Sequence, residues 1–255
     1  ESVQKGLRSL ENDLEGFNEL SKKGFTKEEI KKHLKNACPE RLLYIAEAFR
    51  SGLTVEEINS ITFYDPWFLK QIEEIILWEN LIQKDGLPKD KENFKLIKSM
   101  GFSDSRLAKL INDEESIVRN ERIKLGLRPV YKKVDTCAAE FETKTDYMYS
   151  TYVGDIYNEN EYCESFPTKN KKVIILGGGP NRIGQGIEFD YCCCHASFAL
   201  ADLNIESIMI NCNPETVSTD YDTSDRLYFE PLTLEDVSEI INIESKNGDL
   251  LGAIV

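Results

Sequence analysis

The sequence predicts an all-helical region followed by a partial α/β domain with a parallel sheet. Three observations indicate this fold class. Over residues 1–126, apolar residues recur every three or four positions, which is the period of helices with one buried face. From residue 171, short apolar runs alternate with helical stretches, as in a sheet with crossover helices. The 255 residues, 41% of them hydrophobic, allow one large or two small domains without disulfides.

The helical region starts with an amphipathic pattern that predicts one helix from Val3 to Phe17. Steps of three and four residues place an apolar face on this helix, formed by Val3, Leu7, Leu10, Leu14 and Phe17. A later helix is predicted to begin at Asp65 and Pro66, because Asp caps helices well and Pro is tolerated at the first position. We expect it to end at Gly86.

A pattern typical of a helix–turn–helix corner occurs three times, beginning at Gly24, Gly52 and Gly101. The Gly can end one helix in the left-handed conformation, and a Thr or Ser two residues later can cap the next. In the first two copies a Glu follows three residues after the cap, which completes a capping box. The spacing between copies is unequal, so this is not a strict solenoid repeat.

Residues 127–170 follow neither pattern, and we interpret them mainly as a connector. Tyrosines recur there in polar surroundings, at Tyr147, Tyr149, Tyr152, Tyr157 and Tyr162. They could form a binding strip. We favour a connector whose tyrosine rings pack on both domains while their hydroxyl groups stay in water. The predicted domains are therefore a helical domain at 1–134, a connector at 135–170 and a partial α/β domain at 171–255.

Strands of the α/β domain are predicted at residues 173–176, 207–210, 226–229 and 252–255. A helix is expected between the first two strands, and Thr233 is expected to cap another between the last two. The sequence stops within the last strand, so we expect it to be a fragment of a longer protein.

Charge and cysteine content exclude several classes of protein. Lys and Arg number 31 against 45 Asp and Glu, a net charge of −14, which does not suit a nucleic-acid backbone or an anionic membrane surface. Apolar runs are far shorter than the roughly 20 residues of a membrane span, and no secretory signal is evident. The seven cysteines lack a framework spacing, which indicates reduced thiols in a cytoplasmic protein.

A Gly-rich turn directly follows the first predicted strand and precedes a helix, where backbone N–H groups could hold an anion. The dinucleotide fingerprint fails, because Arg182 stands at the third glycine position and no acid lies at the tip of the second strand. A P-loop is also absent. A ligand role and a purely structural turn both remain open for Gly177, Gly178, Gly179, Asn181, Arg182 and Gly184.

Two further groups of residues could carry chemistry. The run Cys192, Cys193, Cys194 and His195 looks like a metal cluster, but consecutive helical residues point about 100° apart, so we predict packing residues and no metal. Glu188 and Glu215 flank the Gly-rich turn and the exit of the second strand, and turn chemistry does not explain them easily.

Two long runs resemble a known family: GGGPNRIGQGIEFDYCC at 177–193 and NCNPETVSTDYDTSDR at 211–226. Both resemble the start of the second synthetase half of the carbamoyl phosphate synthetase large subunit. Shorter runs resemble the junction before that half and the family's helical oligomerisation domain, at residues 134–141, 147–152, 66–69 and 106–110.

The resemblance implies a cytoplasmic parent enzyme that makes carbamoyl phosphate from glutamine-derived ammonia, bicarbonate and two ATP, for pyrimidine and arginine synthesis. It implies that the α/β domain is a Rossmann-like pre-ATP-grasp domain. The implied partners are the rest of the large subunit with its ATP-grasp modules, a glutamine amidotransferase subunit or fused domain, and a second copy through self-association. ATP and Mg²⁺ or Mn²⁺ would bind those modules; we expect no cofactor in this fragment, which should be inactive alone.

The resemblance also implies site residues. It places Gly186, Glu188 and Glu215 on the wall of an interior tunnel that conducts carbamate, while no catalytic residue is implied in this segment. Glycine, which has no side chain, would leave the tunnel wide at that point, and the carboxylates would keep its wall polar. The alternatives are a stand-alone nucleotide-binding module, such as an NAD-dependent oxidoreductase with a helical cap, and a purely structural assembly element.

Overall fold

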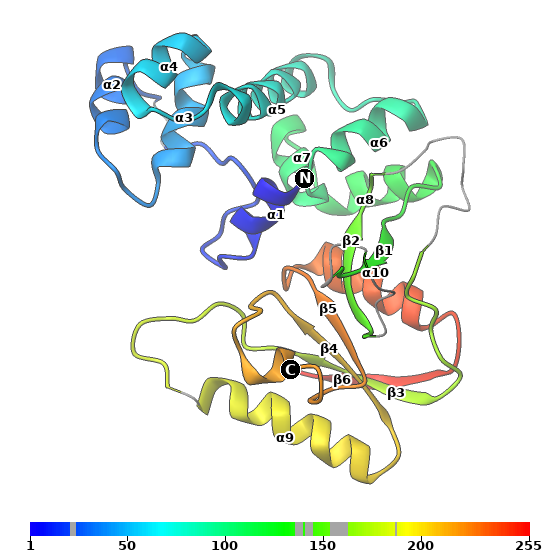
Figure 1. Ribbon diagram of the computed structural model, residues 1–255. Coiled ribbons are helices and arrows are strands. Elements are labelled where there is room, and N and C mark those ends of the chain that lie inside the picture. Colours follow the sequence, from blue (N-terminus) through cyan, green and yellow to red (C-terminus); the bar gives the residue numbers. More distant parts are fainter. Residues whose placement is uncertain (21–23, 136–139, 141–144, 154–162, 187) are drawn as a thin grey trace. The chain divides into compact units, whose positions relative to one another are not determined.

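The computed structural model describes residues 1–20, 24–135, 140, 145–153, 163–186 and 188–255 (Figure 1). These residues form two compact units, which are described separately. A helical unit comprises Leu14–Glu121, and an α/β unit comprises Glu1–Asp13 together with Arg122–Val255. The predicted tyrosine strip lies partly outside the described residues, because Tyr157 and Tyr162 belong to the segments left out. No described helix is both long and apolar enough to cross a membrane.

Caps that the sequence predicts start four helices of the helical unit. Thr26 and Thr54 form the two predicted capping boxes, Asp65 caps a helix with Pro at its first position, and Ser103 accepts from the Arg106 N–H. The helices are α2 (Lys27–Lys35), α3 (Arg41–Arg50), α4 (Val55–Thr62), α5 (Pro66–Asp85), α6 (Lys91–Ser99), α7 (Asp104–Ile111) and most of α8 (Glu115–Lys124).

The helix–turn–helix corners predicted at Gly52 and Gly101 are confirmed, because a helix ends before each glycine and another begins after it. The corner predicted at Gly24 was wrong, because residues 9–20 are not helical and no described helix ends there. Gly24, Gly52 and Gly101 have φ of 70°, 76° and 94°, the left-handed region that ends a helix at little cost for glycine. The helices of this unit bury apolar side chains on one face, with Ile30, Leu34, Ile45, Ile58, Leu69, Ile72, Phe94, Ile97 and Leu107 in the core.

A buried ionic network crosses the helical unit. The Arg106 guanidinium, 2% exposed, lies 2.6 Å from the Glu79 carboxylate, and Arg50 lies 2.5 Å from the other oxygen of Glu79. Arg106 also pairs with Glu19 at 2.9 Å. Burial alone would raise the pKa of Glu19, but the hydrogen bonds and charge of Arg106 outweigh it and lower the pKa to about 2.

The first helix is shorter than its apolar spacing predicts. Helix α1 spans Ser2–Arg8, so the prediction of one helix reaching Phe17 was wrong. Glu11 and Asp13 take φ of 49° and 65°, which no right-handed helix can accommodate. Phe17 is buried in the helical unit, whereas α1 and the residues up to Asp13 belong to the α/β unit.

One sheet organises the α/β unit, in the order β1-β2-β5-β4-β3-β6. Only the β1–β2 pair is antiparallel among the described pairings. The four predicted strands are confirmed, although β6 starts three residues earlier than expected. The strands β1 and β2 lie in the region interpreted as a connector. The bounds are β1 (Val130–Lys133), β2 (Tyr147–Thr151), β3 (Lys171–Leu176), β4 (Glu206–Asn211), β5 (Arg226–Phe229) and β6 (Asp249–Ile254).

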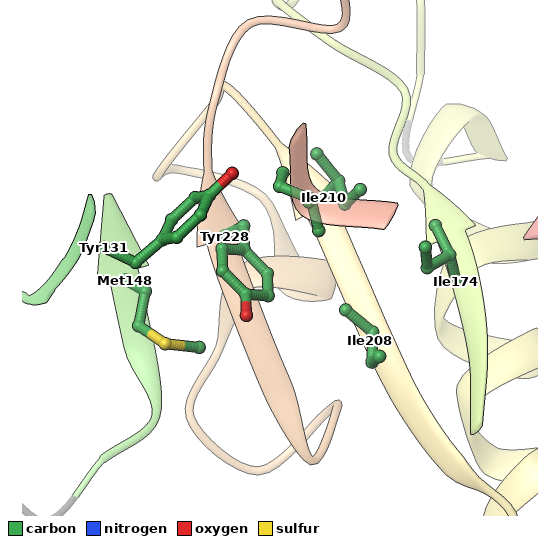
Figure 2. Packing of buried hydrophobic residues seen from close by; sticks show 7 residues of the cluster. Tyr131, Met148, Ile174, Ile208, Ile210 and Tyr228 are labelled. Atoms are coloured by element: carbon green, nitrogen blue, oxygen red, sulfur yellow. The ribbon is translucent and has the colours of Figure 1, made fainter. Parts of the chain in front are cut away.

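Each face of the sheet is covered by a helix, α9 (Glu188–Asp202) on one side and α10 (Leu234–Glu244) on the other (Figure 1). Alternate strand residues point to opposite faces, which separates the core into two clusters. Figure 2 shows the α10 side, which buries Tyr131, Met148, Ile174, Ile208, Ile210 and Tyr228 with Ile240. The α9 side buries Ile175, Met209 and Leu227 with Cys193 and Leu200. Helices on both faces of a mostly parallel sheet confirm the predicted fold class.

Candidate functional site

The Gly-rich turn and the exit of β4 meet at the carboxyl edge of the sheet. Leu176, the last residue of β3, pairs with Ile210 near the end of β4. The Gly177 N–H then donates to the Ile210 carbonyl at 2.8 Å, which holds the start of the turn beside the neighbouring strand. In open α/β sheets this edge is where ligands bind.

Gly177 is required by close packing against Asn211. A Cβ on Gly177 would lie 2.4 Å from Asn211 Cγ, closer than real Cβ atoms approach a neighbour. Asn211 is fully buried, and its Nδ2 donates to Thr216 Oγ1 and Ser218 Oγ, both at 3.3 Å. The glycine therefore makes room for an amide that ties the strand end to the loop after β4.

That loop is also held by α9 through Asp190. The Ser218 N–H donates to Asp190 Oδ2 at 2.6 Å, and Cys194 Sγ donates to the same oxygen at 3.8 Å. Asp190 is buried, and within the described part of the chain no donor reaches its other oxygen. The loop carries Glu215, whose N–H donates to Asn213 Oδ1 at 3.0 Å and whose side chain is exposed.

The second part of the Gly-rich turn, residues 181–186, is exposed along its whole length. It closes on itself, because the Arg182 N–H donates to Gln185 Oε1 at 3.0 Å and the Gln185 N–H donates to the Arg182 carbonyl at 3.1 Å. Gly179 and Gly184 have φ of 73° and 90°, the left-handed region that side chains disfavour. Gly186 directly follows this closed turn.

The structure brings most of the predicted site residues to one edge but does not enclose them. Gly186 and Glu215 are both exposed at the surface of this chain. Helix α9 begins at Glu188, whose side chain lies outside the described residues. The role of these three residues in a tunnel therefore stays a prediction.

The cysteines of α9 differ in environment. Cys192 is exposed, while Cys193 and Cys194 are buried. Burial and the nearby Asp190 carboxylate raise the pKa of both buried thiols, for Cys194 to about 11, which disfavours the thiolate needed for metal binding or nucleophilic attack. No group of three or more His, Cys, Asp or Glu among the described residues is placed to hold a metal ion.

The residues missed by sequence reasoning lie at the N-terminus. Glu11 Oε2 accepts from Arg182 Nη2 at 2.7 Å, which places its carboxylate at the Gly-rich turn. Lys5 lies 3.0 Å from Glu230, the residue that follows β5. The available signal was the polar stretch at residues 11–13, which separates Leu10 from Leu14 in the apolar pattern.

Comparison with known protein families matches two consecutive parts of the sequence. Residues 1–126 match the model described as "Carbamoyl-phosphate synthetase large chain, oligomerisation domain", and residues 169–253 match "Carbamoyl phosphate synthase preATP-grasp domain". The chain belongs to the carbamoyl phosphate synthase large-chain family. The Gly-rich turn, α9 and the loop after β4 all fall within the preATP-grasp match.

Curated carbamoyl phosphate synthase large chains align along almost the whole sequence. The chain is 54% identical to that of Brucella melitensis biotype 1 over 263 residues, covering 100% of this chain. It is 58% identical to that of Neisseria meningitidis serogroup B over 250 residues and 55% identical to that of Pasteurella multocida over 249 residues, covering 97% of this chain in each case. The chain spans 22% of the length of these relatives.

Proposed function

We propose that this chain is part of a glutamine-dependent carbamoyl phosphate synthase large chain and forms one wall of its carbamate passage. The observation that supports this proposal is the meeting of the Gly-rich turn and the loop after β4 at one sheet edge. Gly186 and Glu215 are both exposed there, in two runs that resemble the family. Glu188, at the start of α9, is the third proposed wall residue.

The chemistry of these residues suits a passage for a small polar molecule. Glycine at position 186 has no side chain that would narrow a passage beside the exposed turn, and a carboxylate at position 215 provides hydrogen-bond acceptors along the wall. Both lie open to solvent in this chain, so the opposite wall must come from other parts of the large chain. Enclosure matters because carbamate decays quickly in water.

The remaining properties of the parent enzyme are proposals of the same kind. The enzyme would use glutamine-derived ammonia, bicarbonate and two ATP, and would serve pyrimidine and arginine synthesis in the cytoplasm. ATP and Mg²⁺ or Mn²⁺ would bind the ATP-grasp modules, and a glutamine amidotransferase subunit or fused domain would supply ammonia. The 255-residue chain alone is expected to be inactive.

The first experiment measures ATP formation from ADP and carbamoyl phosphate by the full-length large chain. This is the carbamate-phosphorylating reaction in reverse. Appearance of ATP supports the proposed carbamate kinase half. A folded protein that binds ADP but forms no ATP would contradict it, and a purely structural role for the sheet edge would then be favoured. Binding of NADH to the chain would instead favour a nucleotide-binding module.

The passage itself is tested with Gly186→Phe in the full-length enzyme. We expect bicarbonate-dependent ATP hydrolysis to continue while carbamoyl phosphate production is lost, because the phenyl ring would fill space on the proposed path. Glu92→Phe, at an exposed position of α6, is the control for adding a ring to the surface. Unchanged carbamoyl phosphate production by Gly186→Phe would exclude the passage role.

We further propose that the helical unit associates with a second copy. The support is the description of the matching family model, together with three exposed aromatic residues around the start of α5. Phe63, Trp67 and Phe68 are 86%, 62% and 55% exposed, and we call them the aromatic patch. Sedimentation of the full-length enzyme over a range of concentrations tests this, and a strictly monomeric enzyme would contradict it.

A further inference from the structure

The N-terminal segment, residues 1–13, lies along the carboxyl edge of the sheet, and we call it the strap. Its first contacts are with the ends of β2 and β5. Thr151 Oγ1 donates to Glu1 Oε2 at 2.7 Å, and Lys5 Nζ donates to the Ser150 carbonyl at 2.8 Å. Lys5 also pairs with the fully buried Glu230 carboxylate at 3.0 Å, which anchors the strap in the sheet.

The strap then continues to β4 and β3. Cys212 Sγ, just after β4, donates to the Ser9 carbonyl at 3.4 Å. Glu11 forms its ion pair with Arg182 in the turn that follows β3, at 2.7 Å. The contacts made along the strap thus follow the spatial order of the strands, β2-β5-β4-β3. The strap covers the edge at which a ligand of an open α/β sheet would bind.

Glu11 is closely packed against the Gly-rich turn. A Cβ on Gly179 would lie 2.4 Å from Glu11 Oε1, so the absence of a side chain at position 179 lets the carboxylate approach the backbone. Glu11 has φ of 49°, an uncommon conformation for a residue other than glycine. The local backbone of the strap is therefore shaped so that Glu11 reaches the turn.

The contact leads directly to the proposed passage. Arg182 is joined to Gln185 by two hydrogen bonds, at 3.0 and 3.1 Å, and Gly186 is the next residue. A group that fixes the Arg182 side chain therefore limits the positions available to the whole exposed turn. The turn is otherwise exposed from residue 181 to residue 186.

We propose that Glu11 is a positioning residue for the carbamate passage. It holds Arg182 and the Gly-rich turn in place, so that Gly186 leaves the passage open to carbamate while bulk water is kept out. This inference rests on the proposed function. Glu11 acts through Arg182 and touches no reacting atom. Exposed ion pairs contribute little to folding stability. Removing the Glu11 carboxylate therefore loosens the Gly-rich turn while the chain stays folded.

The test compares three rates of the full-length enzyme with its glutamine amidotransferase, for wild type, Glu11→Gln and Glu11→Ala. The rates are bicarbonate-dependent ATP hydrolysis, ATP formation from ADP and carbamoyl phosphate, and complete carbamoyl phosphate synthesis. We expect both partial reactions to persist while complete synthesis falls by roughly 10-fold or more, since small displacements of a guiding element have large kinetic effects. The ATP consumed per carbamoyl phosphate should rise.

Glu115→Gln is the matched control, because it removes a partly exposed ion pair of similar length, 2.6 Å to Arg119, far from the strap in sequence. A double-mutant cycle with Gly179→Ala adds a second readout. If Glu11 acts by its contact with the turn, the effects of Glu11→Ala and Gly179→Ala on complete synthesis are less than additive.

Three outcomes overturn the inference, and they are distinguishable. Unchanged synthesis by Glu11→Ala shows that the turn needs no such support. A parallel fall of all three rates shows that Glu11 has only a structural role. Wild-type enzyme that forms no ATP from ADP and carbamoyl phosphate contradicts the proposed function itself, and the positioning role with it.

Discussion

The side chain of Asn211 occupies the space that a side chain at position 177 would need. The ideal Cβ position of Gly177 is 2.4 Å from Asn211 Cγ, and Asn211 is fully buried with its amide bonded to the loop after β4. The carboxyl ends of β3 and β4 can therefore lie side by side while Asn211 ties the end of β4 to the loop that follows it. This relationship sets the position of the Gly-rich turn relative to the loop that carries Glu215.

We expect Gly177→Ala to lower the free energy of unfolding by about 1–3 kcal/mol, because overpacking displaces a buried hydrogen-bonded side chain. Urea unfolding followed by circular dichroism measures it. Gly6→Ala is the control, since no atom lies within 4 Å of the new Cβ and α1 is helical there. That variant should be as stable as wild type or more stable by roughly 0.5–1 kcal/mol. Equal stability of Gly177→Ala and wild type would contradict the packing argument.

Glu79 balances two arginines inside the helical unit, at 2.5 Å from Arg50 and 2.6 Å from Arg106. Glu79→Ala leaves the buried guanidinium groups of both arginines without this carboxylate. We therefore expect the free energy of unfolding to fall by about 3–5 kcal/mol. Glu115→Gln removes a partly exposed pair with Arg119 and should cost no more than about 0.5 kcal/mol. Chemical unfolding of both variants measures the two changes. Similar losses of unfolding free energy in the two variants would show that burial of the Glu79 network is not what makes it important.

Glu230 predicts a pH dependence of stability. Burial raises its pKa to about 7 from the ordinary value of 4.5, against the opposing charge of Lys5. Between these values the folded chain retains a proton that the unfolded chain releases. The stability associated with the protonated group is therefore fully present below pH 4.5 and is lost as pH rises through about 7.

Glu230→Gln removes this titration. Relative to wild type, the variant should gain on the order of 1–3 kcal/mol of unfolding free energy as the pH rises through this window. Urea unfolding over a pH series measures the difference. Lys5→Met removes the neighbouring cation and should move the window to higher pH. Parallel pH curves for wild type and Glu230→Gln would show that Glu230 does not titrate in this range.

The aromatic patch predicts two separable effects. Phe63 ends α4 with φ of 59°, a conformation that costs a residue with a side chain about 1–2 kcal/mol and that Asn tolerates better. Phe63→Asn should therefore raise the free energy of unfolding by up to about 1 kcal/mol. Trp67→Ser offers no such gain, because Trp67 lies in the first turn of α5. Both variants should weaken self-association in sedimentation experiments. Loss of stability in Phe63→Asn would contradict the backbone argument, and unchanged association in both variants would count against the patch.

Local signals predicted much of the fold. The capping boxes at Thr26 and Thr54 and the left-handed glycines at the corners involve residues within one turn of each other, so sequence spacing is enough to identify them. The four strands from β3 to β6 were also predictable, because each contains a short apolar run next to turn residues. The Gly-rich turn and the loop after β4 could be placed at one edge, since parallel strands end on the same side.

The sequence by itself therefore determined five capped helix starts, the four strands from β3 to β6 and the edge on which the candidate residues lie. The capped starts are at Thr26, Thr54, Asp65, Ser103 and Thr233. Tertiary structure decided what depends on partners distant in the chain. The strands β1 and β2 are short and mix apolar with polar residues, and the pairing of the two with each other and of β2 with β5 stabilises them. The apolar spacing at Val3 to Phe17 favoured a longer helix, yet α1 ends at Arg8 and Glu11 reaches Arg182, 171 residues away. Such long-range contacts outweigh local helix propensity, which is why the strap was visible only in the folded chain.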